Sequence, residues 1–309
     1  MANSKKTLII GSRGSQLALW QAEHVVRCLQ DNHPGLSVKI TKIKTQGDKI
    51  LDVPLAKVGG KGLFVKELEE ALLDGRIDLA VHSMKDVPTD LPEGLAISAI
   101  TEREDVRDVL IAKPGVTLDN LPKDAVIGTS SLRRQAQLLN YNPAFRIVQL
   151  RGNLNTRLKR MEEQNMDGII LAAAGVKRLG FQDKIAQCLP MELSLPAVGQ
   201  GSLGIETRTA DEEVNRLIAC LNHRESALAV TAERAFLTRL EGGCQVPIGA
   251  CAYVEGDNIT LQGLIARVDG STLLRRQISG NVSKVRELGV RLAEELLDLG
   301  GREILDEVY

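Results

Sequence analysis

The sequence predicts an α/β protein with two similar lobes, followed by a smaller α+β domain that carries an antiparallel sheet. The chain has 309 residues, and hydrophobic cores stop growing near about 250–300 residues, so more than one core is expected. Through the first two thirds, short apolar runs alternate with amphipathic stretches, as in parallel strands joined by helices. After residue 244 the pattern changes to alternating segments separated by turn residues, which is typical of an antiparallel sheet.

The first lobe begins with an apolar run at residues 7–12, which predicts a strand. Ser15 has the side chain of a helix N-cap, and the apolar spacing after it predicts a helix over residues 17–30. The remaining elements predicted for this lobe are strands at 37–45 and 77–81, a glycine-rich loop at 58–62, and a helix at 64–73.

The second lobe repeats this order after a charged stretch at residues 101–108. Its predicted elements are strands at 126–128, 147–150 and 168–172, with helices that begin at Ser131 and Asn153. The third domain is expected to contain strands at 248–254, 259–268 and 272–278, and then one long helix over residues 283–299.

Composition narrows the class of protein. The chain has 39 basic and 40 acidic residues and a net charge of −1, so it lacks the basic excess of a nucleic-acid-binding protein. No apolar run is long enough for a transmembrane helix or a signal peptide, so we expect a cytoplasmic protein that does not bind membranes. The five cysteines include no C-x-x-C pair and the four histidines no H-x-x-x-H pair, so no protein-bound metal is expected.

Basic residues are concentrated in one segment. Residues 125–161 contain no Asp or Glu. The segment's seven basic residues are Arg133, Arg134, Arg146, Arg151, Arg157, Lys159 and Arg160. Such segregation in a nearly neutral chain predicts a site for a polyanion, because arginine binds carboxylates and phosphates through paired donors.

The position of these arginines supports that prediction. Arg133 and Arg134 follow a predicted strand-to-helix turn at residues 129–131, and Arg151 lies at the next such turn. Backbone amides and helix dipoles gather at these turns and favour anions. Lys159 and Arg160 are more simply explained as a solvated helix face. Arg13 occupies the corresponding turn of the first lobe, so we expect both lobes to contact one anionic ligand.

Two residues are candidates for chemistry. Asp86 ends the segment that follows the strand at 77–81 and precedes Pro88, where a carboxylate can protrude into a cleft; a turn or cap hydrogen bond is an equally simple role. Cys244 lies in a glycine-rich loop that leaves its sulfur open to approach, which favours a nucleophile over a buried apolar cysteine.

Six motifs in order along the chain resemble the porphobilinogen deaminase family, also called hydroxymethylbilane synthases. They cover nearly the whole sequence. The motifs are LAKVGGKGLF at 55–64, HSMKDVP at 82–88, GTSSLRRQ at 128–135, LRGN at 150–153, LPAVGQG at 195–201 and EGGCQVPIG at 241–249.

The resemblance implies a fold and a reaction. The first two lobes would resemble periplasmic binding proteins, with the chain returning to the first lobe after the second. The implied domains are residues 1–101 with 201–218, residues 107–195, and residues 224–309. A dipyrromethane cofactor would be joined by a thioether to Cys244. Four porphobilinogen molecules would be added to it with loss of ammonia, and hydrolysis would release the linear tetrapyrrole hydroxymethylbilane.

The resemblance also implies roles for individual residues. Asp86 would assist ammonia loss, stabilise the azafulvene-like cation and manage pyrrole protons. The residues expected to bind carboxylates of cofactor and substrate are Arg13, Ser15, Lys85, Ser131, Arg133, Arg134, Arg151 and Arg157. Three further residues in family motifs or beside the expected cleft are Lys61, Arg178 and Gln200, for which a surface or structural role is an alternative.

Two other functions are compatible with parts of the pattern. A two-lobed, non-enzymatic binding protein for a small polyanion would have the same lobes without chemistry, although the exposed-looking Cys244 weighs against it. A phosphate-transfer enzyme is a third possibility, but residues 55–62 and 199–204 depart from the nucleotide motifs they approach. A monomer is expected, with hinge crossings near residues 101–108 and 193–200.

Overall fold

The computed structural model describes residues 7–49, 62, 64–241 and 246–307. The chain forms two compact units. The first unit takes the chain up to residue 103 together with residues 202–227, and the second takes residues 104–201 together with residue 228 onward. Each unit is described by itself below.

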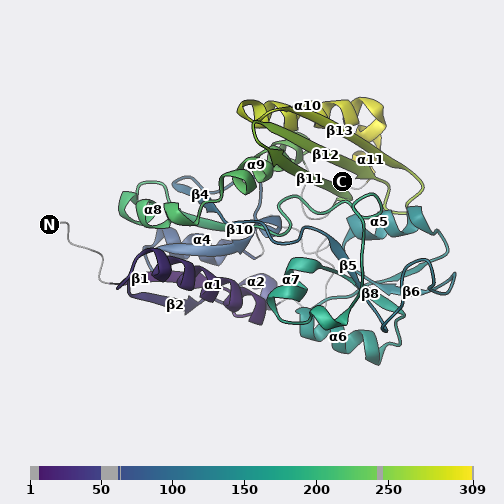
Figure 1. The fold of residues 1–309 in the computed structure, drawn as a ribbon, viewed down its shortest axis with the longest axis horizontal. Helices are drawn as coiled ribbons and strands as arrows, with labels where there is room; N and C mark the ends of the chain where they lie inside the picture. The colour runs from purple at the N-terminus through teal and green to yellow at the C-terminus, as the bar shows by residue number, and fades with distance from the viewer. Residues whose placement is uncertain (1–6, 50–61, 63, 242–245, 308–309) are drawn as a thin grey trace. The chain divides into compact units, whose positions relative to one another are not determined.

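The first unit contains a five-stranded sheet in the order β2-β1-β3-β10-β4 (Figure 1). Strand β1 (Leu8–Ser12) is parallel to β2 (Val38–Lys42) and to β3 (Leu79–Ser83). Strand β10 (Leu203–Arg208) is antiparallel to both β3 and β4 (Leu95–Ile100). The strand that joins the sheet antiparallel therefore comes from the returning chain.

Helix α1 (Gln16–Asn32) covers part of this sheet, and it begins where the sequence predicts: the Ser15 side chain accepts a hydrogen bond from the Ala18 N–H. Helix α4 (Lys66–Leu73) buries Leu68 and Leu72 beneath the sheet. The other helical elements of this unit are α2 (Gln46–Lys49), the 3₁₀ turn η1 (Met84–Asp86), α8 (Glu212–Ile218) and the 3₁₀ turn η3 (Ala219–Leu221).

The second unit begins with a sheet of equivalent order, β7-β6-β8-β5-β9. Strand β6 (Val126–Gly128) is parallel to β7 (Arg146–Val148) and β8 (Gly168–Ala172). Strand β5 (Asp108–Ile111) is antiparallel to β8 and β9 (Ile185–Cys188). In this lobe the antiparallel insertion comes from the entering segment and not from a returning one, but the two lobes have an equivalent strand order.

Three helices connect the strands of this lobe. Helix α5 (Leu132–Tyr141) and helix α6 (Leu154–Glu163) begin at the expected caps: Ser131 accepts from the Arg134 N–H, and Asn153 accepts from the Thr156 N–H. Helix α7 (Ala173–Arg178) follows β8, and the 3₁₀ turn η2 (Gln182–Lys184) leads into β9.

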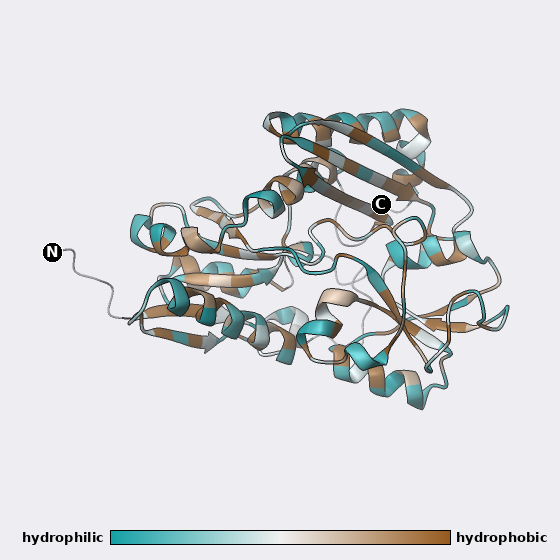
Figure 2. Ribbon diagram, in the orientation of Figure 1, coloured by the Kyte–Doolittle hydropathy of each residue, from teal (hydrophilic) through white to brown (hydrophobic). Residues whose placement is uncertain are grey.

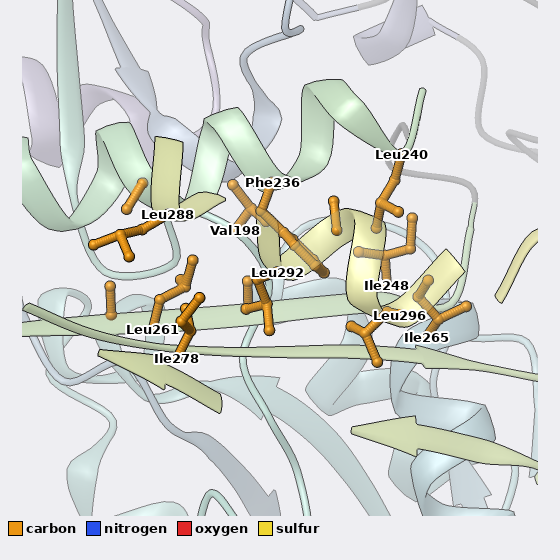
Figure 3. Close-up of a cluster of buried hydrophobic side chains, with 14 of the residues drawn as sticks. Val198, Phe236, Leu240, Ile248, Leu261, Ile265, Ile278, Leu288, Leu292 and Leu296 are labelled. Carbon is orange, nitrogen blue, oxygen red and sulfur yellow. The ribbon is translucent and has the colours of Figure 1, made fainter. Parts of the chain in front are cut away.

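The third domain has the antiparallel sheet β11 (Ile248–Glu255), β12 (Asn258–Ala266) and β13 (Leu273–Asn281). Figure 3 shows its core, where Phe236 of α9 (Arg224–Arg239) and Leu292 of α10 (Val285–Leu296) pack onto Leu261 of the sheet. Position 263 in β12 is a glycine with no room for a side chain, because a Cβ would lie 2.8 Å from the Phe236 ring.

The helix predicted over 283–299 is confirmed, but the prediction missed the change of helix type near its end and the short helix that follows. The 3₁₀ turn η4 (Val282–Lys284) leads into α10, the chain turns through a π-helical segment (Leu297–Gly301), and α11 (Arg302–Asp306) follows. Gly300 has φ of 102°, a left-handed value that interrupts a right-handed helix. In Figure 2 these helices alternate between hydrophilic and hydrophobic positions, as expected for elements with one buried face.

Candidate active site

In the first unit, four predicted site residues lie at one edge of the sheet. Strands β1 and β3 are adjacent and parallel, so their carboxyl ends meet at the same edge. Arg13 and Ser15 follow β1, and Lys85 and Asp86 follow β3. All four residues are half-buried. This edge therefore combines a cation, a hydroxyl and a carboxylate.

Arg13 is oriented by an aromatic ring. Its guanidinium carbon lies 4.2 Å from the centroid of the Phe64 ring, a favourable distance for a cation–π contact. The Phe64 ring covers one face of the guanidinium. The N–H groups of Arg13 lie in the plane of the guanidinium. Phe64 therefore limits the rotamers of Arg13 and directs its donors sideways.

Asp86 is placed by a short, well-anchored turn. It ends the 3₁₀ turn η1, in which Met84 is buried and the Val87 N–H donates to the Met84 carbonyl at 3.2 Å. The Met84 N–H donates to the Ser202 carbonyl at 3.0 Å, which ties the start of the turn to the segment entering β10. The carboxylate of Asp86 thus projects from a fixed backbone.

In the second unit, the corresponding edge is rich in donors. Strands β7, β6 and β8 are parallel neighbours, so the turns after them meet at one edge. Ser131 begins α5 and Arg151 precedes the cap of α6, so two helix N-termini open here. Arg157 is half-buried, and its Nε donates to the Gly152 carbonyl at 2.8 Å.

The flanking basic residues of this segment differ from one another. Lys159 is exposed and pairs with Glu163 one turn along, as expected for a solvated face. Arg160, expected on the same face, is half-buried, and its Nη1 donates to the Arg151 carbonyl at 3.3 Å. Arg160 therefore supports the backbone of Arg151.

Arg133 and Arg134 occupy a buried network that the sequence did not predict. Their side chains are 5% and 7% exposed, and both pair with the fully buried carboxylate of Asp108, at 2.8 Å and 2.6 Å. Asp108 also accepts from Ser194 Oγ at 2.9 Å and from Gln200 Nε2 at 3.0 Å. One carboxylate therefore joins the entry strand β5, the start of α5 and the returning segment.

Asp108 is ionised in this network. Burial by itself would raise the pKa of Asp108, but the adjacent guanidinium groups of Arg133 and Arg134 outweigh it and hold that pKa well below its usual range. The carbonyls of Leu195 and Ile170 accept further hydrogen bonds from the two arginines. The network is a structural centre of the second unit.

Replacing Asp108 by Asn is expected to lower the free energy of unfolding by about 3–5 kcal/mol, because two buried guanidinium groups lose their counter-charge. Denaturant titration at pH 7 measures this. The exposed variant Glu163→Gln should change stability by less than about 1 kcal/mol. Because the pKa of Asp108 is lowered on folding, the stabilisation by its carboxylate is present above about pH 4 and is lost at lower pH. The difference in free energy of unfolding between Asp108→Asn and Glu163→Gln should therefore shrink at low pH. A difference that stayed constant down to pH 2 would contradict the pairing.

Arg178 and Gln200 hold the chain crossings. Arg178 Nη2 donates to the Gly201 carbonyl at 2.6 Å, and Gln200 Nε2 donates to the Val106 carbonyl at 2.7 Å. The neighbouring Lys177 pairs with Asp105 at 2.9 Å. Helix α7 therefore binds both crossing segments, a structural role that the sequence left open for these residues.

Two predicted residues, Lys61 and Cys244, lie outside the described residues. Sequence reasoning also missed two buried carboxylates that organise the units, Asp108 and Glu206. Neither strand was predicted, but a signal for each carboxylate was present: Asp108 and Glu206 each adjoin a short apolar run, where a charged residue needs a partner. The sequence did not show which residue that partner is.

The fold and the candidate site define a class of two-lobed α/β proteins with cationic and hydroxyl side chains at the carboxyl ends of the strands of each lobe. The chain matches the family model "Porphobilinogen deaminase, dipyromethane cofactor binding domain" over residues 8–216, and "Porphobilinogen deaminase, C-terminal domain" over residues 227–298. It belongs to the porphobilinogen deaminase family.

Whole-chain relatives agree with this assignment. A porphobilinogen deaminase of Geotalea uraniireducens is 60% identical over 304 residues, covering 98% of this chain and 95% of that protein. One of Geobacter sulfurreducens is 59% identical over 302 residues, again covering 98% and 95%. Among solved structures, the methionine-binding protein MetQ is similar at 15% identity over 70% of this chain and 90% of that chain, with a TM-score of 0.46.

The chain is therefore a transferase of tetrapyrrole biosynthesis that polymerises four porphobilinogen molecules into hydroxymethylbilane, with release of ammonia, on a dipyrromethane cofactor. A binding protein without chemistry is not supported. The donors of the second unit fit the cofactor, since guanidinium groups and helix N-termini suit the carboxylates carried by every pyrrole ring. Among the described helices, none is long and apolar enough to cross a membrane.

Proposed function

We propose that Asp86 is the catalytic carboxylate and that the basic residues at the two sheet edges bind the carboxylates of cofactor and substrate. The observation that carries this proposal is that Asp86 and Arg13 follow neighbouring parallel strands at one sheet edge of the first unit, with Asp86 on a backbone fixed by hydrogen bonds.

Asp86 acts where positive charge develops. When the aminomethyl carbon–nitrogen bond of porphobilinogen breaks, ammonia leaves and a cationic carbon remains, which a nearby carboxylate stabilises. After the new carbon–carbon bond forms, the attacked pyrrole carbon loses a proton, and Asp86 is placed to accept it. The half-buried position of Asp86 limits the water that would otherwise weaken both effects.

The proposed carboxylate ligands are those at the two edges. They are Arg13, Ser15 and Lys85 in the first unit, and Ser131, Arg133, Arg134, Arg151 and Arg157 in the second. Arg133 and Arg134 are buried on Asp108, so their proposed contribution is to fix the turn that carries Ser131 beside the ligand. Lys61, Arg178 and Gln200 are also assigned to the site, the last two by supporting its backbone.

Cys244 is the proposed attachment point of the cofactor, through a thioether to its sulfur. The attached dipyrromethane would supply the free pyrrole carbon to which the first porphobilinogen is joined, and each added ring would supply the carbon for the next. The protein's contribution is to bind the accumulating carboxylates, since every ring adds two negative charges. Arginine suits this task because its charge does not change across the physiological range.

The domain limits remain proposals: residues 1–101 with 201–218, residues 107–195, and residues 224–309, in a cytoplasmic monomer. The boundaries between the two units lie at residues 103/104, 201/202 and 227/228. The Asp108 network holds Ser194 and Gln200 within the second unit. This supports hinges at the unit boundaries themselves rather than across the whole of residues 193–200.

Arg151→Gln tests the carboxylate-binding role. We expect the KM for porphobilinogen to rise about 10- to 100-fold, the loss of a charge-assisted hydrogen bond, and intact mass spectra to show fewer added substrate units. Lys159→Gln removes an exposed cation from the same segment and should leave both readouts unchanged. A wild-type KM and a complete series of adducts in Arg151→Gln would remove Arg151 from the site.

A further inference from the structure

A buried hydrogen-bonded pair lies directly before the turn that carries Asp86. His82 Nε2 is 2.8 Å from Glu206 Oε2, and the two side chains are 4% and 1% exposed. His82 is in β3 and Glu206 is in the neighbouring strand β10. No step of the proposed mechanism uses either residue.

A second carboxyl group faces this pair from helix α4. Glu69 is only 8% exposed. Burial and the charge of Glu206 raise the pKa of Glu69 to about 7, while His82 opposes the rise. The other charged residue acting on Glu69 is Glu70 of the same helix. Strands β1 and β4, which also contact α4, carry no charged residue.

The pair is connected to the turn of Asp86 through contacts between strands β3 and β10. Gly204 of β10 pairs with His82 in the sheet, and the Met84 side chain fills the space over Gly204, where a Cβ would lie 2.2 Å from its sulfur. The Met84 N–H then bonds to the Ser202 carbonyl. Strand β3 is thus fixed to β10 at two successive points, and Asp86 lies two residues beyond the second.

We propose that His82, held by Glu206, is a positioning residue for Asp86: the buried pair fixes the end of β3 and with it the turn that carries the catalytic carboxylate. This inference rests on the proposed role of Asp86. A buried polar pair gives little net stability compared with apolar side chains of similar size, but it fixes the geometry of the groups it joins. Loss of the pair should therefore lower turnover and leave substrate affinity unchanged.

His82→Leu is expected to lower kcat at least 10-fold, with KM within about twofold of wild type and the cofactor mass retained. His82→Gln, which keeps an N–H donor for Glu206, should recover most of the lost kcat. If His82→Leu does not fold, Glu206→Gln tests the same pair by removing its charge at constant size.

Thr207→Val is the matched control. Thr207 is fully buried in the same strand as Glu206, and its hydroxyl bonds to Ser98 and Asn215. This variant should lower stability while kcat stays at the wild-type value. An equal fall in kcat for Thr207→Val, or a wild-type kcat in His82→Leu, would overturn the proposal.

Glu69→Gln adds a pH readout. Because the pKa of Glu69 is raised on folding, wild-type stability should decrease as pH rises from about 4.5 to about 7, where Glu69 must ionise beside Glu206. Gln cannot ionise, so the variant should lose this decrease and show a flatter kcat profile between pH 6 and 8. A kcat profile of Glu69→Gln identical to that of wild type would contradict an interaction between Glu69 and the His82–Glu206 pair.

The two proposals fail in different ways. An inactive Asp86→Asn beside a fully active His82→Leu would overturn only the positioning role. A fully active Asp86→Asn would overturn the assignment of Asp86 itself.

Discussion

Asp86→Asn is expected to lower kcat by about 10²- to 10⁴-fold, the usual contribution of a positioned acid–base group. The amide is nearly the same size as the carboxylate, so the turn at residues 84–86 should be unchanged. It carries no charge, however, and can neither stabilise the cation left by ammonia nor accept the pyrrole proton. Substrate carboxylates are bound by other residues, so KM should stay within a few-fold of wild type.

Steady-state kinetics and intact mass spectrometry check this expectation together. The variant should retain the cofactor mass and form its first substrate adduct slowly. Asp90→Asn, an exposed aspartate four residues further along, should show the wild-type kcat. If Asp86→Asn turned over at a near-normal rate, Asp86 would have no part in the chemistry.

Cys244→Ser is expected to abolish turnover through loss of the covalent cofactor. The denatured wild-type protein should exceed its sequence mass by one dipyrromethane, and the variant should show no excess. A serine hydroxyl is a far weaker nucleophile than a thiolate at neutral pH, so attachment should not occur at that position.

Cys220→Ser supplies the control, because Cys220 is the exposed cysteine among the described residues and its loss should leave the mass excess intact. A wild-type preparation without excess mass should gain it on incubation with porphobilinogen. An excess that persisted in Cys244→Ser would place the attachment at another residue.

Local patterns in the sequence predicted much of the fold. Ser15 was expected as a helix cap and helices were expected to begin at Ser131 and Asn153, and each of the three residues accepts the cap hydrogen bond. These predictions are confirmed because a cap and the helix after it depend on residues three or four positions apart. The resemblance predicted the family and the chemistry.

Partners distant in the sequence were not predictable. Asp108 reaches Arg134 across 26 residues and Gln200 across 92, and His82 pairs with Glu206 across 124. Charge patterning indicated that the arginines mattered but not that an internal carboxylate held two of them. The antiparallel strands β5 and β10 were missed for the same reason, since their pairing is set by topology rather than by local periodicity.

Strand β10 has a consequence for how this chain is made. It lies between β3 and β4, yet it is synthesised about a hundred residues after β4. On the ribosome, the N-terminal sheet must wait with the position between β3 and β4 empty while the whole second lobe emerges. The second lobe has no such gap, because all of its strands lie between Asp108 and Cys188. We therefore expect the order of folding to run against the order of synthesis, with the catalytic turn reaching its final geometry late, when β10 is inserted.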